Sequence, residues 1–560
     1  MTWKNKTFIL GWIAYGLIFF FFVYGIGFGM PIETIPDETA QLKNIYAMLN
    51  AKSPVLQYPS SYSVWTHYTY IIPTVIYWVG YYLFADIPNL AELKFYILNN
   101  YQEVLPFLRF FTASLFFVGL LLVKKVIEES FNKEQAWFFF LFVGMNLLVV
   151  INVHQSKHWM ADYGLMMIGL YCYWNWLKER GWLRLLSSFF IFSVSVLSTP
   201  AFIVYGVYFL LLHYHRTGSM KDVAKYAVAF VVFLFGMAAV THLFLGSGGA
   251  VGGRNILAKM FSGFYFDDAM RVFWEFSPMV LLMFIGAFTY MREKKYYILL
   301  LPFIGWLILL HIAFSHFEPR YALIFMIEGS LIATFFAKFL WDKHRKIFFG
   351  TATLFILYNG LSVVGWLHVI GAKDTRVEAR EWLETNAKPD DFIIYNVLGF
   401  NYLPLTDKTV SFLENHFPNA LGTREKLHRQ YHLHSGKNGL LLWKLVDADY
   451  QVDAVVDALK HEGYDILFVN EHFGHVNGIN IFNQPHDKAL QKFLESYDHH
   501  VVKRIEPFRT EPADREMIGD VLYNFANPLY TLWHLERSGP VVTIFEVKQE
   551  SIKKVTLGKK

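Results

Sequence analysis

The sequence predicts a polytopic α-helical membrane protein of about eleven transmembrane helices, followed by a C-terminal α/β domain on the outer face. Apolar runs of about 20 residues recur along the chain as far as Ile370, as transmembrane helices require. Basic residues gather at every second turn between these runs, which is typical of cytoplasmic turns. After Ile370 the composition changes to that of an ordinary soluble domain. We therefore expect a membrane domain over residues 1–370 and an extracytoplasmic domain over residues 371–560.

The overall composition supports the membrane assignment. Of the 560 residues, 54% are hydrophobic and 19% are aromatic, which is more than a soluble chain of this length needs. The net charge of +4 is small, and we predict no nucleic-acid partner. The single cysteine, Cys172, lies inside an apolar run, so no intrachain disulfide can form.

The first apolar run, Phe8 to Gly29, reads as an uncleaved first span, because no small-residue cleavage site follows it. Lys4 and Lys6 precede it, which predicts a cytoplasmic N-terminus in a plasma (cytoplasmic) membrane protein. Residues 30–104 then form one large outer loop. Its apolar stretch Tyr62–Phe84 is interpreted as surface or re-entrant helices, since a crossing there would place Lys124 and Lys125 outside.

The later runs alternate in direction, and each inward run ends in Lys or Arg. The predicted spans are Leu105–Val123, Gln135–Val153, Trp159–Leu177, Leu185–Ser198, Ala201–Leu212, Tyr226–Leu245, a span ending before Arg292, Tyr296–Phe314, a span from Tyr321 to Lys343, and Ile347–Ile370.

The residues after Ile370 show the short mixed patterns of an α/β domain. Strands are predicted at Phe392–Tyr395, Ile466–Val469 and Val541–Val547, and helices at Val377–Leu383, Val452–Leu459 and Lys488–Leu494. An odd number of spans places this domain on the same face as the large outer loop.

Two adjacent carboxylates, Asp37 and Glu38, stand where the first span leaves the membrane. After them Leu42, Ile45, Tyr46 and Leu49 fall on one helical stripe, which predicts a helix in the interface plane. An acidic pair held at the membrane surface suits general base work or metal binding. The alternative is an N-cap, since Asp readily caps helices.

Further polar groups fall in the outer loops or at the outer ends of spans: Arg109, Lys157, His158, Asp162, Arg254, Asp267, Asp268, Glu318, Arg320 and Tyr321. Ionisable groups at membrane depth are costly and often functional. Arginines suit a phosphate, and a membrane phosphate beside a base describes a lipid-linked donor. As alternatives, Arg109 could snorkel to headgroups, Asp162 could cap its helix, and Arg320 could pair with Glu318.

Five short motifs occur in order on the predicted outer face: Pro36–Ala40, Leu108–Phe110, Lys157–Asp162, Glu318–Tyr321 and Asp374–Leu383. Together they resemble the GT-C glycosyltransferases, in particular the branch of protein O-mannosyltransferases and lipid A aminoarabinose transferases. The sequence departs from that pattern at Ser198-Thr199-Pro200, where many of these enzymes carry Lys, which leaves the donor headgroup open.

The resemblance implies an inverting transfer of a sugar from a polyprenyl-phosphate donor to a hydroxyl of a protein, lipid or glycan acceptor. Asp37 would be the general base, with Glu38 supporting it or binding a divalent metal together with it. Asp162 would orient donor or acceptor. The groups implied for the donor phosphate are Arg109, Arg320, Tyr321, Lys157 and His158.

Two other classes compete with this interpretation. A transporter or flippase of a lipid-linked anion predicts charges near mid-membrane and internal repeats. A non-catalytic relative would use its outer domain to bind glycan. We favour the enzyme, because the charges cluster at the outer face and no repeat is visible.

Overall fold

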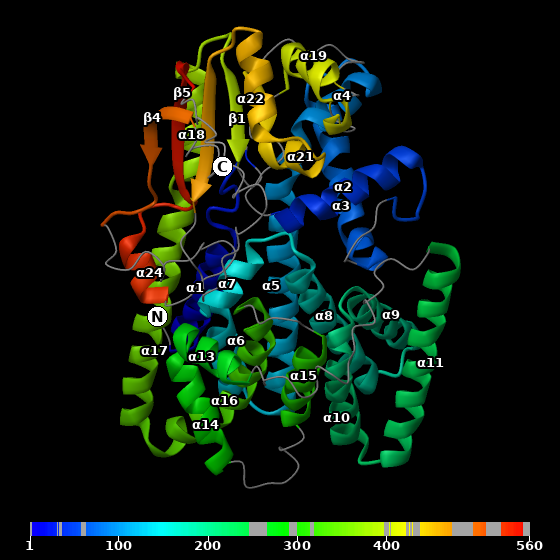
Figure 1. Cartoon of the computed structure of the whole chain (residues 1–560). Helices are drawn as coiled ribbons and strands as arrows, with labels where there is room; N and C mark the ends of the chain where they lie inside the picture. The colour runs from blue at the N-terminus through cyan, green and yellow to red at the C-terminus, as the bar shows by residue number, and fades with distance from the viewer. Residues whose placement is uncertain are drawn as a thin grey trace, which may run out of the picture. The chain divides into compact units, whose positions relative to one another are not determined.

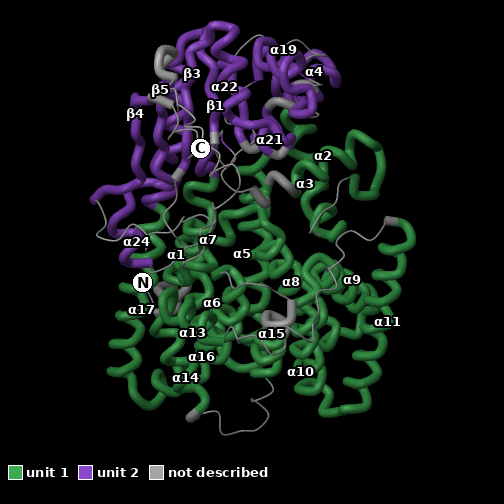
Figure 2. The backbone as a smooth tube through the Cα atoms, viewed as in Figure 1, with its two compact units in different colours: residues 1–26, 37–81, 104–367 green, residues 27–36, 82–103, 368–560 purple. Residues whose placement is uncertain are grey.

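The computed structural model describes most of the chain in two compact units (Figures 1 and 2). The described residues are 3–30, 32, 36–57, 63–245, 266–290, 299–313, 319–396, 403, 405–421, 425, 428, 437–472, 497–510 and 528–552. Unit 1 comprises residues 1–26, 37–81 and 104–367, and unit 2 comprises residues 27–36, 82–103 and 368–560.

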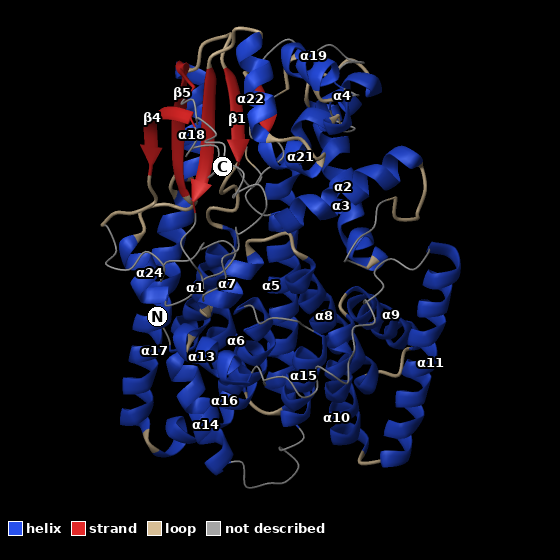
Figure 3. Cartoon of the chain, viewed as in Figure 1, coloured by secondary structure: helices blue, strands red, loops and turns tan. Residues whose placement is uncertain are grey.

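Unit 1 is helical throughout its described part (Figure 3). Its helices are α1 Trp3–Val23, α2 Pro36–Ala51, α3 Val64–Phe84, α5 Leu105–Ser130, α6 Lys133–Gly144, α7 Leu147–Val153, α8 His158–Lys178, α9 Trp182–Ser198, η2 Pro200–Tyr205, α10 Gly206–Thr217, α11 Met220–Leu245, α13 Phe266–Phe276, α14 Pro278–Tyr290, α15 Leu300–Ala313, η4 Pro319–Ala322, α16 Leu323–Lys343 and α17 Arg345–Gly371. The labels η2 and η4 denote short 3-10 helices.

Four described helical stretches are long and apolar enough to cross a membrane: Tyr101–Ser130, Met220–Phe244, Pro319–Lys343 and Arg345–Asn386. The pair α6–α7 would make a fifth if it counts as one span. The predicted number of about eleven stays a prediction.

The predicted span Gln135–Val153 is not a single straight helix. It is broken into α6 and α7, which meet at an angle of 64°. The cause is local: the Asn146 side chain accepts hydrogen bonds from the backbone N–H groups of Leu148 (3.0 Å) and Val149 (3.3 Å), so α7 begins afresh with its own cap.

Helices α5 and α8 lie side by side through a pair of glycines (Figure 1). A Cβ on Gly119 of α5 would come within 2.9 Å of the Gly164 carbonyl oxygen, and a Cβ on Gly164 within 2.8 Å of that of Leu115. Small residues permit such close approach between membrane helices. The contact sets the close packing of α5 against α8.

Helix α3 runs without a break through Pro73. One of its faces is buried, and the opposite face is exposed. Its buried face carries Thr66, His67 and Tyr70. Its exposed side chains include Ile72 at 65% and Leu83 at 69% exposure, which suits contact with lipid better than contact with water.

Unit 2 contains a five-stranded sheet in the order β2-β1-β3-β5-β4, with β2, β1 and β3 parallel and β5 antiparallel to both β3 and β4. The strands are β1 Phe392–Asn396, β2 Asn438–Leu441, β3 Ile466–His472, β4 Tyr497–Ile505 and β5 Val541–Ile552. The helices and 3-10 turns of unit 2 are α4 Leu90–Asn100, η1 Tyr101–Val104, α18 Thr375–Asn386, α19 Asp407–His416, η5 Pro418–Ala420, α21 Leu442–Asp447, α22 Val452–His461 and α24 Pro528–His534.

Alternate residues of β1 face the two halves of this core. Phe392 and Ile394 pack in one cluster with residues of α19 and α22, whereas Ile393 and Tyr395 pack in another with residues of α18. The predicted strands β1, β3 and β5 are present, as are the helices predicted at 377–383 and 452–459. The helix predicted at 488–494 lies outside the described residues.

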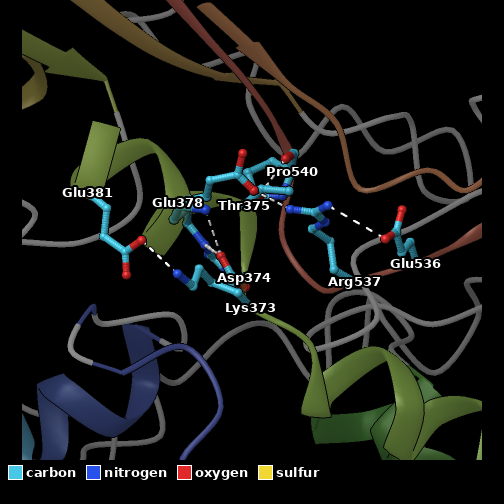
Figure 4. A network of polar contacts seen from close by, with 9 residues as sticks. Lys373, Asp374, Thr375, Glu378, Glu381, Glu536, Arg537 and Pro540 are labelled. Carbon is cyan, nitrogen blue, oxygen red and sulfur yellow. Dashed lines mark hydrogen bonds and ion pairs between the residues drawn. The ribbon is translucent and has the colours of Figure 1, made fainter. Parts of the chain in front are cut away.

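A buried polar network joins α18 to the approach to β5 (Figure 4). The Asp374 carboxylate caps α18 by accepting from the Arg376 backbone N–H at 2.9 Å, and it also binds the Arg376 guanidinium. Ser538 donates its hydroxyl to Asp374 at 2.9 Å, and Thr375 donates its hydroxyl to the Pro540 carbonyl at 2.7 Å. At Gly539, where φ is +103°, a Cβ would fall 2.2 Å from the Thr375 hydroxyl, so this position requires glycine.

Candidate functional site

Glu38 and Arg109 form a buried ion pair between α2 and α5 of unit 1. Arg109 Nε donates to Glu38 Oε1 at 3.0 Å, and Nη2 donates to Oε2 at 2.7 Å, a bidentate geometry. Both side chains are 0% exposed. Arg109 therefore does not snorkel toward the membrane surface, which was its alternative role.

Ser156, in the connection between α7 and α8, completes the surroundings of Glu38. Its backbone N–H donates to Glu38 Oε1 at 2.6 Å and its hydroxyl donates to the same oxygen at 3.0 Å. Arg109 Nη1 donates to the carbonyl of Ile26 at 3.1 Å. One carboxylate thus ties together the start of α2, the N-terminal part of α5 and the α7–α8 connection.

Asp37 directly precedes Glu38 in the first turn of α2. Because the helix begins at Pro36, Asp37 lies inside the first turn rather than ahead of it, where a carboxylate still complements the positive helix end. Its side chain lies outside the part of the chain that the structure describes. The structure does describe the backbone of Asp37 and the contacts of the adjacent Glu38 side chain.

The segment of residues 156–162, here called the α8 start, carries three more of the predicted residues. Lys157 and His158 are largely buried, at 6% and 8% exposure. The Lys157 carbonyl accepts the Tyr70 hydroxyl of α3 at 3.1 Å. The His158 ring packs against Trp159, with centroids 5.3 Å apart.

Asp162 is completely buried, one turn inside α8. Its Oδ2 accepts the Thr199 hydroxyl at 2.7 Å, and its backbone carbonyl accepts the Ser195 hydroxyl at 2.9 Å. Its Oδ1 has no hydrogen-bond partner among the described residues. Since the N-cap position of α8 is Lys157, Asp162 does not cap the helix, which was its alternative role.

Arg320 and Tyr321 lie in η4, at the entry to α16. The Arg320 guanidinium stands 5.5 Å from the centroid of the Tyr321 ring. The centroid of the Tyr321 ring is 6.0 Å from that of the Trp159 ring. The backbone carbonyl of Tyr321 accepts the Trp306 indole N–H at 3.0 Å. Glu318, the alternative partner of Arg320, lies outside the described residues.

These contacts bring most of the predicted residues to the α8 start. Glu38 and Arg109 reach it through Ser156, and Tyr321 reaches it through Trp159. Of the remaining predicted groups, Arg254 lies outside the described residues. Asp267 and Asp268 lie in the first turn of α13, where Asp268 pairs with Arg271 at 3.1 Å.

The described residues contain no group of three or more His, Cys, Asp or Glu side chains that could hold a metal ion. The Glu38 oxygens already bind Arg109 and Ser156, so this carboxylate is poorly suited to a divalent ion in the geometry seen. His154 contacts the carbonyl oxygens of Val150 and Tyr24 through its two ring nitrogens, both at 2.8 Å. Both ring nitrogens of His154 are therefore engaged by backbone carbonyls.

Sequence reasoning missed several residues that this arrangement uses, namely Tyr70, Ser156 and Thr199. It also missed Glu328, a buried carboxyl group in α16. Glu328 carried a usable signal, because a carboxyl group inside the apolar run of α16 is costly and often functional. The hydroxyl groups carried none, since Ser, Thr and Tyr are common in helices and only the fold reveals their partners.

Comparisons with known proteins give structural likenesses only. No family model and no curated protein matches the chain. A structure of ArnT from Cupriavidus metallidurans bound to undecaprenyl phosphate is similar, with 13% identity, a TM-score of 0.48, and coverage of 90% of this chain and 97% of that chain. AglB, an archaeal oligosaccharyltransferase from Archaeoglobus fulgidus in complex with an inhibitory peptide and a dolichol-phosphate, is similar with 9% identity, a TM-score of 0.42, and coverage of 98% and 89%.

ArnT is a lipid A aminoarabinose transferase, from the branch that the sequence motifs resemble, and both ArnT and AglB are GT-C superfamily members. Because the TM-scores are below 0.5, neither likeness supports the site or the function proposed below.

Proposed function

We propose that the chain is a membrane glycosyltransferase that moves a sugar from a polyprenyl-phosphate donor to an acceptor hydroxyl on the outer face, with inversion. The observation that carries this proposal is the buried Glu38–Arg109–Ser156 cluster, which fixes Asp37 at the start of α2. Because Arg109 and Ser156 hold the adjacent Glu38 at the start of α2, a carboxylate at position 37 is better suited to act as a general base than to serve only as a helix cap.

Asp37 takes the role of base, and Glu38 takes the role of support. The Glu38 carboxylate is bound by Arg109 and by both donors of Ser156, so it is not available to accept a substrate proton. Asp37 accepts the proton of the acceptor hydroxyl as that oxygen attacks the anomeric carbon. The bond between this carbon and the phosphate oxygen breaks in the same displacement, which inverts the configuration and releases polyprenyl phosphate.

The donor phosphate is assigned to Arg320 and Tyr321, with Lys157 and His158 at the α8 start. Positive groups placed where negative charge develops on a leaving phosphate stabilise the transition state. The Arg320 guanidinium lies over the Tyr321 ring, and the Tyr321 ring packs at a tilt against Trp159, which keeps the guanidinium near the α8 start. Phosphate binding by Arg109 stays a prediction, and its ion pair adds a second role as the anchor of Glu38.

Asp162 is proposed to orient a hydroxyl of the donor or acceptor. Its Oδ2 is held by Thr199, whereas its buried Oδ1 has no partner among the described residues. Carboxylate oxygens without protein donors are suited to sugar hydroxyls.

The proposed topology places the N-terminus in the cytoplasm and residues 371–560 outside. A labelling experiment tests it with one cysteine in a Cys172→Ser background. Ala454→Cys is suitable, because Ala454 is an exposed residue of α22. An impermeant maleimide should label intact cells. Labelling only after permeabilisation would reject this topology.

The flippase alternative gains one observation, since Asp162 and Glu328 are carboxyl groups buried within unit 1. The other charged groups of the proposed site, however, cluster at the predicted outer ends of the spans, and the sequence shows no internal repeat. The enzyme therefore remains the better proposal.

One experiment separates the two functions. The purified protein in proteoliposomes receives a panel of radiolabelled hexosyl and pentosyl polyprenyl phosphates and membrane-derived acceptors. We expect labelled product and an equal amount of released polyprenyl phosphate. Movement of intact donor across the bilayer without release would support the flippase and reject the transferase.

A further inference from the structure

A buried carboxyl group lies at each end of the η2 segment. At its start, the Thr199 hydroxyl donates to Asp162 of α8 at 2.7 Å. At its end, the Tyr205 hydroxyl lies next to the Glu328 carboxyl group of α16. The same Tyr205 hydroxyl is hydrogen-bonded to the hydroxyl of Tyr163 in α8. This short 3-10 helix is thus hydrogen-bonded at both ends to α8, which carries Asp162 of the proposed site, and its end lies next to α16.

Burying the Glu328 carboxyl group at this position costs free energy. It lies in the apolar helix α16 and is 3% exposed. Its Oε2 has no hydrogen-bond partner among the described residues. A buried polar atom without a partner destabilises a fold, and an ionisable group inside a membrane helix usually has a function. Packing alone would be served better by Leu or Met.

An aromatic series connects η2 to the proposed phosphate site. The Phe202 ring of η2 lies 4.6 Å from that of Tyr163 and 6.3 Å from that of Trp159. The Trp159 ring lies 6.0 Å from that of Tyr321, and the Arg320 guanidinium lies over the Tyr321 ring. A shift of η2 therefore reaches Arg320 through Trp159.

We propose that Glu328 and Tyr205 are positioning residues for the donor-phosphate site, which they act on by holding η2 and, through Trp159, the Arg320–Tyr321 turn. This inference rests on the proposed transferase function. It predicts that loosening η2 weakens donor binding while the chemical step, which depends on Asp37, is little changed.

Tyr205→Phe tests this with a matched control. It removes only the hydroxyl between Glu328 and Tyr163. Tyr208→Phe removes a hydroxyl from the next turn, where the Tyr208 side chain is 9% exposed, its ring stacks on Tyr205 at 6.0 Å, and its hydroxyl has no partner among the described residues. We expect Tyr205→Phe to raise the donor KM about tenfold, the usual effect of one lost hydrogen bond. For Tyr208→Phe, KM should stay within about twofold.

Glu328 gives an independent readout. Glu328→Gln keeps an oxygen that can accept from Tyr205, whereas Glu328→Leu does not, so the donor KM should rise less in the Gln variant than in the Leu variant. If Tyr205→Phe does not fold, Thr199→Val loosens the other end of η2 and should raise the same KM. A merely structural role would lower the melting temperature of these variants without this ordering of KM values.

The outcomes separate the two proposals. If the wild-type protein transfers sugar and Tyr205→Phe keeps a donor KM equal to that of Tyr208→Phe, the positioning role is overturned and the transferase stands. If the wild-type protein transfers sugar from none of the donors, the transferase is overturned and the positioning role falls with it.

Discussion

Two buried ion pairs, Glu38–Arg109 in unit 1 and Asp374–Arg376 in unit 2, have nearly the same chemistry. In each, the arginine binds both carboxylate oxygens, at 3.0 and 2.7 Å in the first pair and at 2.9 and 3.0 Å in the second. All four side chains are 0% exposed. Each carboxylate also accepts a serine hydroxyl, from Ser156 at 3.0 Å and from Ser538 at 2.9 Å.

The pairs differ in the chain distance that they span. Asp374 and Arg376 are two residues apart, and Asp374 caps the helix in which Arg376 lies. Glu38 and Arg109 are 71 residues apart and join separate helices. The local pair stabilises one helix start and its link to β5, whereas the distant pair fixes the residue proposed as base. Nearly the same bonding therefore stabilises the fold in unit 2 and, in the proposed function, supports catalysis in unit 1.

The largest effect is expected from breaking the distant pair. Arg109→Met leaves Glu38 charged and buried without its partner, which costs about 3–5 kcal/mol. The double variant Glu38→Gln/Arg109→Met removes both charges and should regain part of this loss. Thermal unfolding in detergent measures it. Arg184→Met is the control, because Arg184 pairs with Glu179 at the exposed surface, where a pair contributes about 0–1 kcal/mol. Wild-type stability of Arg109→Met would contradict the importance of the pair.

A smaller effect is expected at Arg320, the arginine assigned to substrate rather than to a carboxylate. Arg320→Ala should raise the donor KM by about 10- to 100-fold, because a hydrogen bond to a charged group contributes about 1.5–3 kcal/mol. Arg320→Lys should restore only part of the affinity if the contact is bidentate. Arg271→Ala, at an exposed arginine of α13, is the control. Donor kinetics unchanged in Arg320→Ala would reject this assignment.

The smallest effect is expected at the local pair, and it concerns stability alone. Asp374→Asn keeps the capping ability, since Asn caps about as well as Asp, but removes the charge that binds Arg376. We expect a loss of about 1–3 kcal/mol in unit 2, with turnover per folded molecule unchanged. Asp453→Asn, at an exposed position in the first turn of α22, is the control. A specific loss of turnover would end the contrast between the two pairs.

The Asp374 carboxyl group is expected to make the stability of unit 2 depend on pH. Burial raises the pKa of the Asp374 carboxyl, but the charge and hydrogen bonds of Arg376 outweigh this and hold the pKa below its ordinary value. A lowered pKa contributes stability above the unfolded value of about 3.9, and this stability is lost as the pH falls through the folded pKa. Hydrogen exchange in α18 and β5 should therefore accelerate below about pH 4. The Asp374→Asn variant should show a weaker acceleration.

The sequence carried the information for local features and lacked it for distant contacts. β1, β3 and β5 could be predicted because they are apolar runs in a buried sheet. β2 was missed because it has only four residues, and β4 because it is an edge strand with Asp498, His499 and His500 in it. The break between α6 and α7 was missed because Asn146 inside an apolar run was not recognised as a cap.

The candidate site shows the same division. Glu38, Arg109, Asp162 and Arg320 could be singled out as ionisable groups near the membrane surface. Their partners could not, because Ser156 lies 118 residues from Glu38 and Thr199 lies 37 residues from Asp162. Such contacts depend on how α5, α8 and α9 pack.

The most direct test of the central claim is the turnover of Asp37→Asn, measured by transfer from radiolabelled polyprenyl-phosphate sugars and normalised to protein amount. Asn preserves size and most of the capping ability, and it leaves the Glu38–Arg109 pair in place. If Asp37 is the base, protein level and melting temperature should hold while turnover falls by about 10²–10⁴-fold. Near-normal turnover would contradict the account, and Asp162 would then become the leading candidate for the base.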